Sequence, residues 1–367
     1  MTGWDRVVGQ SRAVELLQQA AARPAHAYLL VGPRGSGVED AARCFAAALV
    51  APDGDERAWS LAMRDEHPDI VVLDPPETQI RVEVARQVVD EAHRSPVEGD
   101  RKVIVLFGAE RLRLNPTAAN ALLKTLEEPP PRSHLVLVTD RADALLPTIR
   151  SRCQRVDFAF LAEPQVRDAV LAAGLDEGRA ALVARLAGGR LDRARRLADH
   201  YGPVRDMFAA VPERLDGSGG AVARAVDDVT GALKDAVAVL ESEHEREEEA
   251  LQTELEEAGY QTRVAKARTK QLQERHVREH RRARTDALLE GITALETVYR
   301  DALAGSAAPQ LNTDRAALTF DPRACAAALE ACRSARQALG EFNPSEGLLL
   351  ENLFLQLPGS APLAPSM

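Results

Sequence analysis

The first 160 residues contain five short apolar runs that are continuous rather than alternating. A strand reads as a continuous apolar run when helices bury both of its faces, as they do in a parallel sheet. Stretches with helical spacing separate the runs, for example residues 11–22, 81–93 and 116–128. The pattern predicts a three-layer α/β domain over residues 1–160. The expected strands are residues 28–31, 70–73, 103–107, 135–139 and 156–160.

The helix expected at residues 116–128 has signals at both ends. Asn115 can cap its first turn, and Pro116 suits the first helical position because a proline there loses no hydrogen bond. Pro129-Pro130-Pro131 then stops it, since a residue before proline disfavours the helical conformation.

The strand pattern ends near residue 160, and the rest of the chain has helical spacing. We expect a small helical lid domain over residues 161–203, with its helices broken at Gly174 and Gly188-Gly189. A helical collar domain is expected over residues 204–358, followed by a disordered tail at 359–367. The predicted fold class is therefore α/β followed by all-α.

Two oppositely charged blocks interrupt the helical region. Residues 241–257 are rich in glutamate and residues 263–284 in Arg and Lys, with Gly259-Tyr260 between them. A reversal at Gly259-Tyr260 would form a long charged helical hairpin, with Glu249 near Lys270 and Glu254 near residues 265–266. Either two solvated helical faces pair weakly there, or the basic arm touches DNA.

Charge and composition exclude several classes of protein. The net charge of −10 argues against coating of nucleic acid by the whole surface. No run approaches the ~20 apolar residues of a membrane span, and we expect a cytoplasmic protein with no membrane partner. The four cysteines form no CxxC pair, so neither a zinc module nor a disulfide framework is expected, and we interpret them as buried small side chains.

The sequence GPRGSGVED, residues 32–40, lies between an apolar run and a helix and has the glycines of a phosphate-binding loop. A functional loop of the form GxxxxGK[ST] has a lysine for the phosphates and a hydroxyl for Mg²⁺. After Gly32, Gly35 and Gly37, this chain has Val38 and Glu39 at those two positions. A glutamate there would repel a triphosphate by about 4 kcal/mol per close charge pair at an effective dielectric constant near 20. We expect the turn to form without binding a nucleotide.

A second part of the same machinery is also missing. An ATPase of this architecture places an Asp-Glu pair after the third strand to hold Mg²⁺. Here the third strand is followed by Phe107-Gly108-Ala109-Glu110, in which Glu110 is the only acid.

Three arginines, Arg150, Arg152 and Arg155, lie close together between the fourth and fifth strands. Two interpretations are open: either they are chance residues of a surface turn, or one of them is presented to the nucleotide of a neighbouring subunit. A guanidinium supplied in trans can raise the rate of phosphoryl transfer by ~10³–10⁵.

Several motifs resemble the bacterial clamp-loader subunits of the AAA+ superfamily. They are VVGQ at 7–10, HAYLLVG at 26–32, HPD at 67–69, NALLKTLEEPP at 120–130 and SRC at 151–153. The resemblance is strong over residues 4–200. It is weaker at the end, where Asn343-Pro344 and residues 348–357 resemble the last collar helix.

Two kinds of clamp-loader subunit carry SRC, and the resemblance is to the delta-prime kind. The gamma and tau motor subunits have an intact GK[ST] loop, whereas delta-prime often has a degenerate one and does not hydrolyse ATP. Val38, Glu39 and the missing Asp-Glu pair fit the delta-prime kind.

The resemblance implies a member of the DNA polymerase III clamp loader, a component of the holoenzyme that is not an ATPase by itself. Such a ring loads the sliding clamp on primed DNA during replication. The implied partners are gamma or tau, delta, the clamp and primer-template DNA. Arg152 would be the arginine finger in trans, and Thr139 would be at the sensor position.

One alternative is a gamma/tau-type motor subunit that hydrolyses ATP with a non-standard phosphate loop. Another is a DNA-binding module that uses residues 263–284.

The chain departs from the family pattern in two places. Residues 51–66, where the family has a four-cysteine zinc module, contain no cysteine, so we expect no metal and no bound cofactor. The second-sensor arginine of the family would fall near Asp192 or Arg193.

Overall fold

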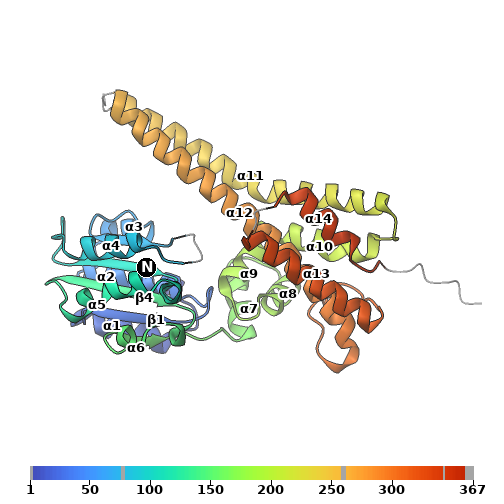
Figure 1. The fold of residues 1–367 in the computed structure, drawn as a ribbon, viewed down its shortest axis with the longest axis horizontal. Coiled ribbons are helices and arrows are strands. Elements are labelled where there is room, and N and C mark those ends of the chain that lie inside the picture. Colours follow the sequence, from blue (N-terminus) through green and yellow to red (C-terminus); the bar gives the residue numbers. More distant parts are fainter. Residues whose placement is uncertain (1–2, 76–78, 258–261, 342–343, 360–367) are drawn as a thin grey trace, which may run out of the picture. The chain divides into compact units, whose positions relative to one another are not determined.

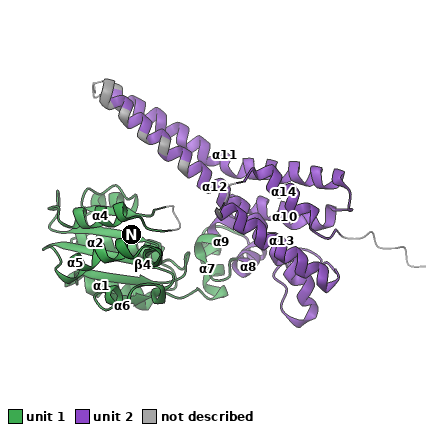
Figure 2. Cartoon of the chain, in the orientation of Figure 1, with its two compact units in different colours: residues 1–175, 187–194 green, residues 176–186, 195–367 purple. Residues whose placement is uncertain are grey.

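The computed structural model describes residues 3–75, 79–257, 262–341 and 344–359. The chain divides into two compact units (Figure 2). Unit 1 comprises Met1–Leu175 and Ala187–Ala194, and unit 2 comprises Asp176–Leu186 and Arg195–Met367. The expected lid, 161–203, is shared between the units, and its standing as a separate domain stays a prediction. The expected disordered tail lies outside the described residues, except for Gly359.

Unit 1 is built on a five-stranded sheet in the order β2-β3-β4-β1-β5. Every pair of neighbouring strands is parallel, as predicted from the continuous apolar runs. Because the strands are parallel, the loops that follow β1, β3 and β4 meet at one edge of the sheet. The strands are β1 (Ala27–Val31), β2 (Ile70–Leu73), β3 (Lys102–Phe107), β4 (Ser133–Thr139) and β5 (Gln154–Asp157).

The fifth strand differs from the prediction, which placed it at residues 156–160. It begins earlier, at Gln154, and ends at Asp157. It lies at the edge of the sheet, so its flanking positions are exposed and can be polar, and a search for continuous apolar residues misses them. Phe158 still packs in the core beyond the strand, whereas the Phe160 side chain is 56% exposed.

Helices cover both faces of the sheet and complete the predicted three layers (Figure 1). Tyr28 and Leu30 of β1 face one core, with α1 and α2, while Leu29 faces the other, with α4 and α5. The predicted cap of α5 is confirmed, because the Asn115 side chain accepts a hydrogen bond from the N–H of Ala118 at 3.2 Å. The helices of this part are α1 (Ser11–Ala22), α2 (Val38–Val50), α3 (Glu56–Met63), α4 (Val82–Ala92), α5 (Pro116–Glu127) and α6 (Pro147–Arg150), with short 3₁₀ helices η1 (Gly3–Arg6), η2 (Ala109–Leu114) and η3 (Ala142–Ala144).

Three short helices follow the sheet, as the sequence predicts. They are α7 (Glu163–Ala172), α8 (Glu177–Ala187) and α9 (Leu191–Ala198). Gly174, Gly188 and Gly189 between them all have positive φ angles, a conformation that glycine adopts without steric cost.

The regular elements described in unit 2 are all helices. Its core includes one face of α12, with Leu288, Ile292, Leu295 and Tyr299 all buried. The helices are α10 (Tyr201–Arg214), α11 (Gly219–Glu257), α12 (Thr262–Ala304), α13 (Pro322–Glu341) and α14 (Glu346–Leu355), with η4 (Gly305–Ala307). In the part of the chain that the structure describes, none of the helices has the length and apolar character needed to cross a membrane.

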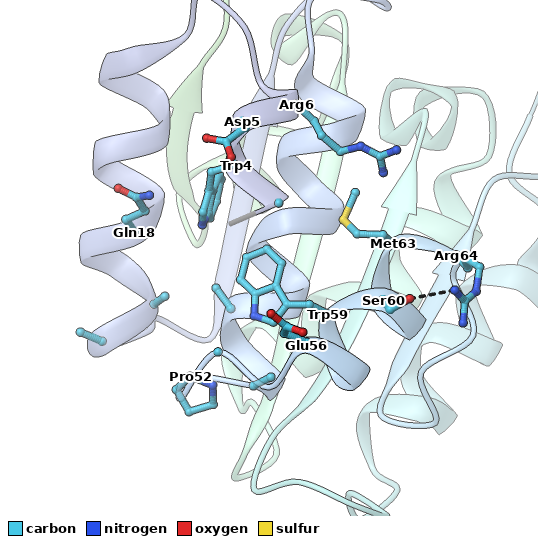
Figure 3. Close-up of a pocket in the computed structure, with 16 residues that line it drawn as sticks. Trp4, Asp5, Arg6, Gln18, Pro52, Glu56, Trp59, Ser60, Met63 and Arg64 are labelled. Atoms are coloured by element: carbon cyan, nitrogen blue, oxygen red, sulfur yellow. Dashed lines mark hydrogen bonds between the residues drawn. The ribbon is translucent and has the colours of Figure 1, made fainter. Parts of the chain in front are cut away.

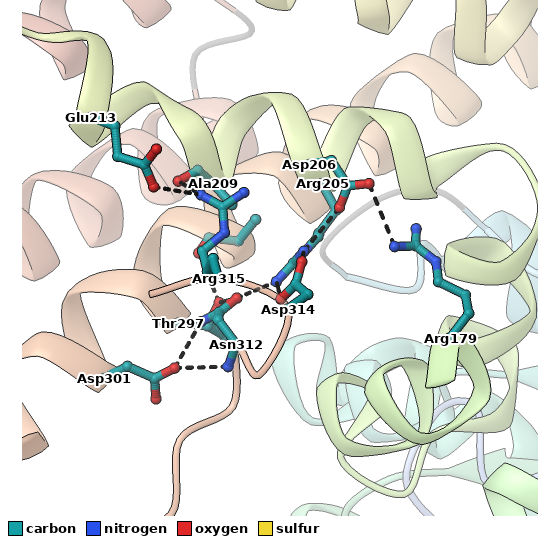
Figure 4. A network of polar contacts seen from close by, with 11 residues as sticks. Arg179, Arg205, Asp206, Ala209, Glu213, Thr297, Asp301, Asn312, Asp314 and Arg315 are labelled. Carbon is teal, nitrogen blue, oxygen red and sulfur yellow. Dashed lines mark hydrogen bonds and ion pairs between the residues drawn. The ribbon is translucent and has the colours of Figure 1, made fainter. Parts of the chain in front are cut away.

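A buried polar network ties the irregular segment after η4 to the helices of unit 2 (Figure 4). The guanidinium of Arg205 in α10 is 1% exposed and pairs with the carboxylate of Asp314. Asp301 of α12 accepts hydrogen bonds from the backbone N–H groups of Leu311, at 3.0 Å, and Asn312, at 2.8 Å. These contacts fix the start of the segment, and Leu318 and Phe320 pack against the core further along it.

The two charged blocks form the predicted antiparallel hairpin of α11 and α12. Glu247 pairs with Arg275 and Glu241 with His280, which favours pairing of the arms with each other. These pairs are displaced by a few residues from the expected register, and the expected proximity of Glu249 and Lys270 stays a prediction. The Gly259-Tyr260 reversal and the side chain of Glu254 lie outside the described residues.

Candidate functional site

The glycine-rich loop joins β1 to α2 at the carboxyl edge of the sheet, as predicted. Gly35 has a φ of 80° and Gly37 one of 92°, and Gly37 directly precedes α2. The N–H of Gly32 donates to the carbonyl of Thr139 at 2.9 Å, which fixes the loop to the end of β4. The backbone therefore forms a turn of the kind that presents N–H groups to an anion.

The anion on this loop is one of the chain's own side chains. Both carboxylate oxygens of Glu39 lie 3.4 Å from the backbone nitrogen of Gly35, which donates to them. Burial raises the pKa of Glu39 above its ordinary value of 4.5, and the nearby charge of Asp192 raises this pKa further, against hydrogen bonds from the backbone. Glu39 thus brings negative charge to a position where a triphosphate would need positive charge.

A second carboxylate covers the loop from α9. The N–H of Leu191 donates to the carbonyl of Gly35 at 2.8 Å. A Cβ atom on Gly35 would lie only 1.5 Å from Oδ1 of Asp192, so this carboxylate lies directly over the loop. Asp192 is one of the two positions at which the family resemblance would place the second-sensor arginine. An anion is present there in place of a cation.

The lysine position of the loop is also unsuited to phosphate. The side chain of Val38 is 1% exposed and packs in the core between the sheet and α2. It offers no donor and does not face a ligand.

A guanidinium fills the end of β3, where an ATPase would hold Mg²⁺. Arg111 donates from Nη2 to the carbonyl of Phe107 at 3.1 Å and to Oδ1 of Asp74 at 3.2 Å. Its Nε also donates to the carbonyl of Gly108 at 3.1 Å. A divalent cation at this place would have to compete with this guanidinium for the carboxylate of Asp74. No sequence pattern indicates this position of Arg111, because its side chain folds back onto the strand end over the left-handed Gly108.

Glu110 and Thr139 bind each other at the same edge of the sheet. Oγ1 of Thr139 donates to Oε2 of Glu110 at 2.9 Å and accepts from the N–H of Arg141 at 3.1 Å. The side chain of Thr139 is buried at the end of β4, in agreement with its predicted place in the chain, while its sensor role stays a prediction.

Arg150 is the last residue of α6, and the other two arginines after β4 have different surroundings. Arg152 is one third exposed, and its Nη2 lies 2.7 Å from Oε1 of Glu127 at the end of α5, while its Nη1 donates to the carbonyl of Thr148 at 2.9 Å. Arg155 is more exposed and pairs with Asp157 within β5. Arg152 therefore lies on the surface of unit 1 as a guanidinium held by an exposed ion pair.

In the HPD motif, Asp69 holds the backbone of residues 97–99 in place, and we call this arrangement the Asp69 latch. The carboxylate of Asp69 is fully buried and accepts hydrogen bonds from three consecutive backbone N–H groups, those of Val97, Glu98 and Gly99, at 2.5, 2.9 and 2.7 Å. Burial alone would raise the pKa of Asp69, but these donors outweigh it and hold that pKa below 3.8.

A groove of about 1210 Å³ lies elsewhere on unit 1 (Figure 3). Trp4 and Trp59 line it, with their ring centroids 6.4 Å apart. Among the described residues, its lining does not include the glycine-rich loop, so the groove is separate from the phosphate-loop site.

The cysteines have the buried positions predicted for them. Cys44, Cys325 and Cys332 are buried, and Cys153 is partly buried. Burial raises the pKa of the Cys44 and Cys153 thiols to about 12, which makes both poor nucleophiles and poor metal ligands.

The comparisons with known proteins agree on one group. Residues 9–162 match the family model described as "DNA polymerase III, delta subunit". The chain is 42% identical over 141 residues to the DNA polymerase III subunit delta' of Pseudomonas aeruginosa, covering 36% of this chain and 42% of the relative. It is 30% identical over 185 residues to the delta' subunit of Bacillus subtilis, covering 48% and 56%.

The chain is also similar to a tau subunit. It is 34% identical over 164 residues to the DNA polymerase III subunit tau of Bacillus subtilis, covering 42% of this chain and 29% of that protein. The chain spans about half the length of the delta' relatives it matches. Residues 9–162 thus match the family described as "DNA polymerase III, delta subunit", and the chain is similar to delta-prime subunits of this polymerase.

Proposed function

We propose that this chain is a delta-prime subunit of a DNA polymerase III clamp loader that does not hydrolyse ATP. The observation that carries the proposal is the carboxylate of Glu39 on the N–H of Gly35. A phosphate entering the loop must displace this carboxylate and approach Asp192 as well. The guanidinium of Arg111 at the end of β3 supports the same conclusion for Mg²⁺.

In this proposal the chain acts in a cytoplasmic ring with gamma or tau and delta, which opens the sliding clamp and loads it on primer-template DNA. Its matches to delta' and tau proteins support membership of such a complex. Its own chemical contribution is Arg152, supplied in trans to the ATP of a motor subunit. An exposed ion pair contributes only ~0.2–1 kcal/mol, so Glu127 is a weak competitor against a triphosphate for this guanidinium.

The first test is the behaviour of the isolated chain with Mg²⁺-ATP. We expect neither turnover nor saturable binding of a fluorescent ATP analogue. Hydrolysis by the isolated chain would contradict the proposal and favour the alternative, a gamma/tau-type motor subunit with a non-standard loop.

The second test is Arg152→Ala in a reconstituted ring. We expect the isolated variant to fold with a free energy of unfolding within ~1 kcal/mol of wild type. The ring should lose ATP hydrolysis at one site by ~10³–10⁵-fold. Arg155→Ala is the matched control, because Arg155 is another exposed arginine in an ion pair. Equal ATPase activity in rings that carry either variant would remove Arg152 from the mechanism.

A further inference from the structure

Two histidines from opposite arms of the charged hairpin stack on each other. The rings of His244 in α11 and His276 in α12 lie 3.9 Å apart between centroids and are inclined by only 6°. Their side chains are 12% and 7% exposed. Nearer the start of α11 the buried positions are apolar, as at Leu233 and Val237. Positions between two packed helices are normally apolar, so a buried pair of imidazoles there requires an explanation.

A carboxylate completes a set of three possible metal ligands. Oε2 of Glu279 lies 3.0 Å from Nε2 of His244, and Glu279 follows His276 by three residues, on the same face of α12. His244, His276 and Glu279 each offer one ligand atom, and these three atoms lie within 4.8 Å of one another. Ligand distances of about 2.0–2.2 Å to Zn²⁺ require them to be closer. Binding of an ion therefore requires at least one ring to tilt out of the stack.

Two further carboxylates are placed to orient a ligating histidine. Nδ1 of His276 lies 3.1 Å from Oε1 of Glu248, and its Nε2 lies 3.0 Å from Oε2 of Glu247. Metal-ligating histidines characteristically donate the N–H of their other ring nitrogen to a carboxylate, which fixes the tautomer and strengthens the ligand. His276 has such a partner whichever nitrogen binds the metal.

We propose that His244, His276 and Glu279 bind a divalent transition-metal ion, with Zn²⁺ as the best match. Two imidazole nitrogens and one carboxylate oxygen suit Zn²⁺, which is commonly held by three protein ligands and a water. The ion would join α11 to α12 and so clamp the register and the stiffness of the hairpin. This site is independent of the role proposed for unit 1.

The arrangement favours a structural site over a hydrolytic one. Residues 276–280, HVREH, have the H-x-x-E-H spacing of one class of zinc peptidases, in which both histidines bind zinc and the glutamate is the base. Here Nε2 of His280 lies 2.9 Å from Oε1 of Glu241, and Glu279 itself faces His244. The motif's two histidines thus have different partners.

The experiment is a titration of the full chain, without a histidine tag, with Co²⁺ followed by Zn²⁺. We expect visible d–d absorption of four-coordinate Co²⁺ that saturates at one equivalent and is displaced by Zn²⁺. His244→Asn and His276→Asn should each weaken binding at least about tenfold. Glu279→Gln should do the same without disturbing the packing, because this side chain is 45% exposed.

His280→Asn is the matched control, since it changes a histidine of the same hairpin that is outside the ligand set. It should bind Co²⁺ as wild type does. Far-UV circular dichroism checks that each variant keeps its helix content. If a histidine variant loses helix content, the result for Glu279→Gln decides the test. Absence of one-to-one binding by the wild type, or equal weakening by His280→Asn and Glu279→Gln, would overturn the proposal.

Discussion

The latch formed by Asp69 can be tested by the isosteric substitution Asp69→Asn. Asparagine keeps the shape but loses the charge, and its amide N–H₂ group faces a backbone N–H that donated to the carboxylate. Hydrogen bonds to a charged acceptor are worth about 1.5–3 kcal/mol and neutral ones about 0.5–1.5. Three such donors lie at 2.5–2.9 Å from the carboxylate in wild type. We expect unit 1 to lose about 3 kcal/mol of unfolding free energy.

Tryptophan fluorescence during urea unfolding measures this loss in unit 1 alone. The chain contains two tryptophans, and both Trp4 and Trp59 lie in unit 1. The free energy of unfolding follows from the linear dependence on urea, with the slope unchanged if the variant keeps the wild-type fold. Asp100→Asn is the control, because the side chain of Asp100 is 95% exposed.

The pH dependence gives the sharper criterion. The folded pKa of Asp69 is below the ordinary 3.8, so its contribution is fully present above that value and is lost as the pH falls through the folded pKa. The difference between wild type and Asp69→Asn should therefore be constant from about pH 7 to 5 and shrink below about pH 4. A difference under ~1 kcal/mol at pH 7, or one that persists undiminished in acid, would refute the latch.

Three further substitutions test other parts of the structure. Gly35→Ala should destabilise unit 1 by about 1–3 kcal/mol in the same fluorescence assay, because an alanine at a φ of 80° is strained and Asp192 must move away; a neutral effect would mean that the loop is not held in this conformation. Asn115→Ala should cost about 1 kcal/mol through loss of the α5 cap, and an unchanged urea midpoint would contradict that contact. Arg205→Met should cost unit 2 about 3–5 kcal/mol, followed by circular dichroism, because it leaves the carboxylate of Asp314 without its guanidinium; wild-type stability would show that the network carries little energy.

Local sequence was sufficient for the elements whose signals lie within a few residues. The apolar runs predicted strands β1 to β4 and their parallel pairing, because helices cover both faces of these strands. The cap at Asn115 and the breaks at Gly174 and Gly188-Gly189 follow from backbone stereochemistry, which acts at short range. The glycines of the phosphate loop predicted its turn for the same reason, whereas the loss of phosphate binding that Val38 and Glu39 indicate stays a prediction.

Features that join distant segments required the tertiary structure. Nothing near Gly35 in the sequence indicates that Asp192 covers it, and nothing near β3 indicates that Arg111 fills the strand end, because both contacts depend on how far-apart segments pack. The fifth strand was misplaced because edge exposure is a property of the sheet. In the hairpin, the charged blocks predicted two paired arms but did not fix their register. In the register that the structure has, His244 stacks on His276, and Glu279 lies close to both imidazoles.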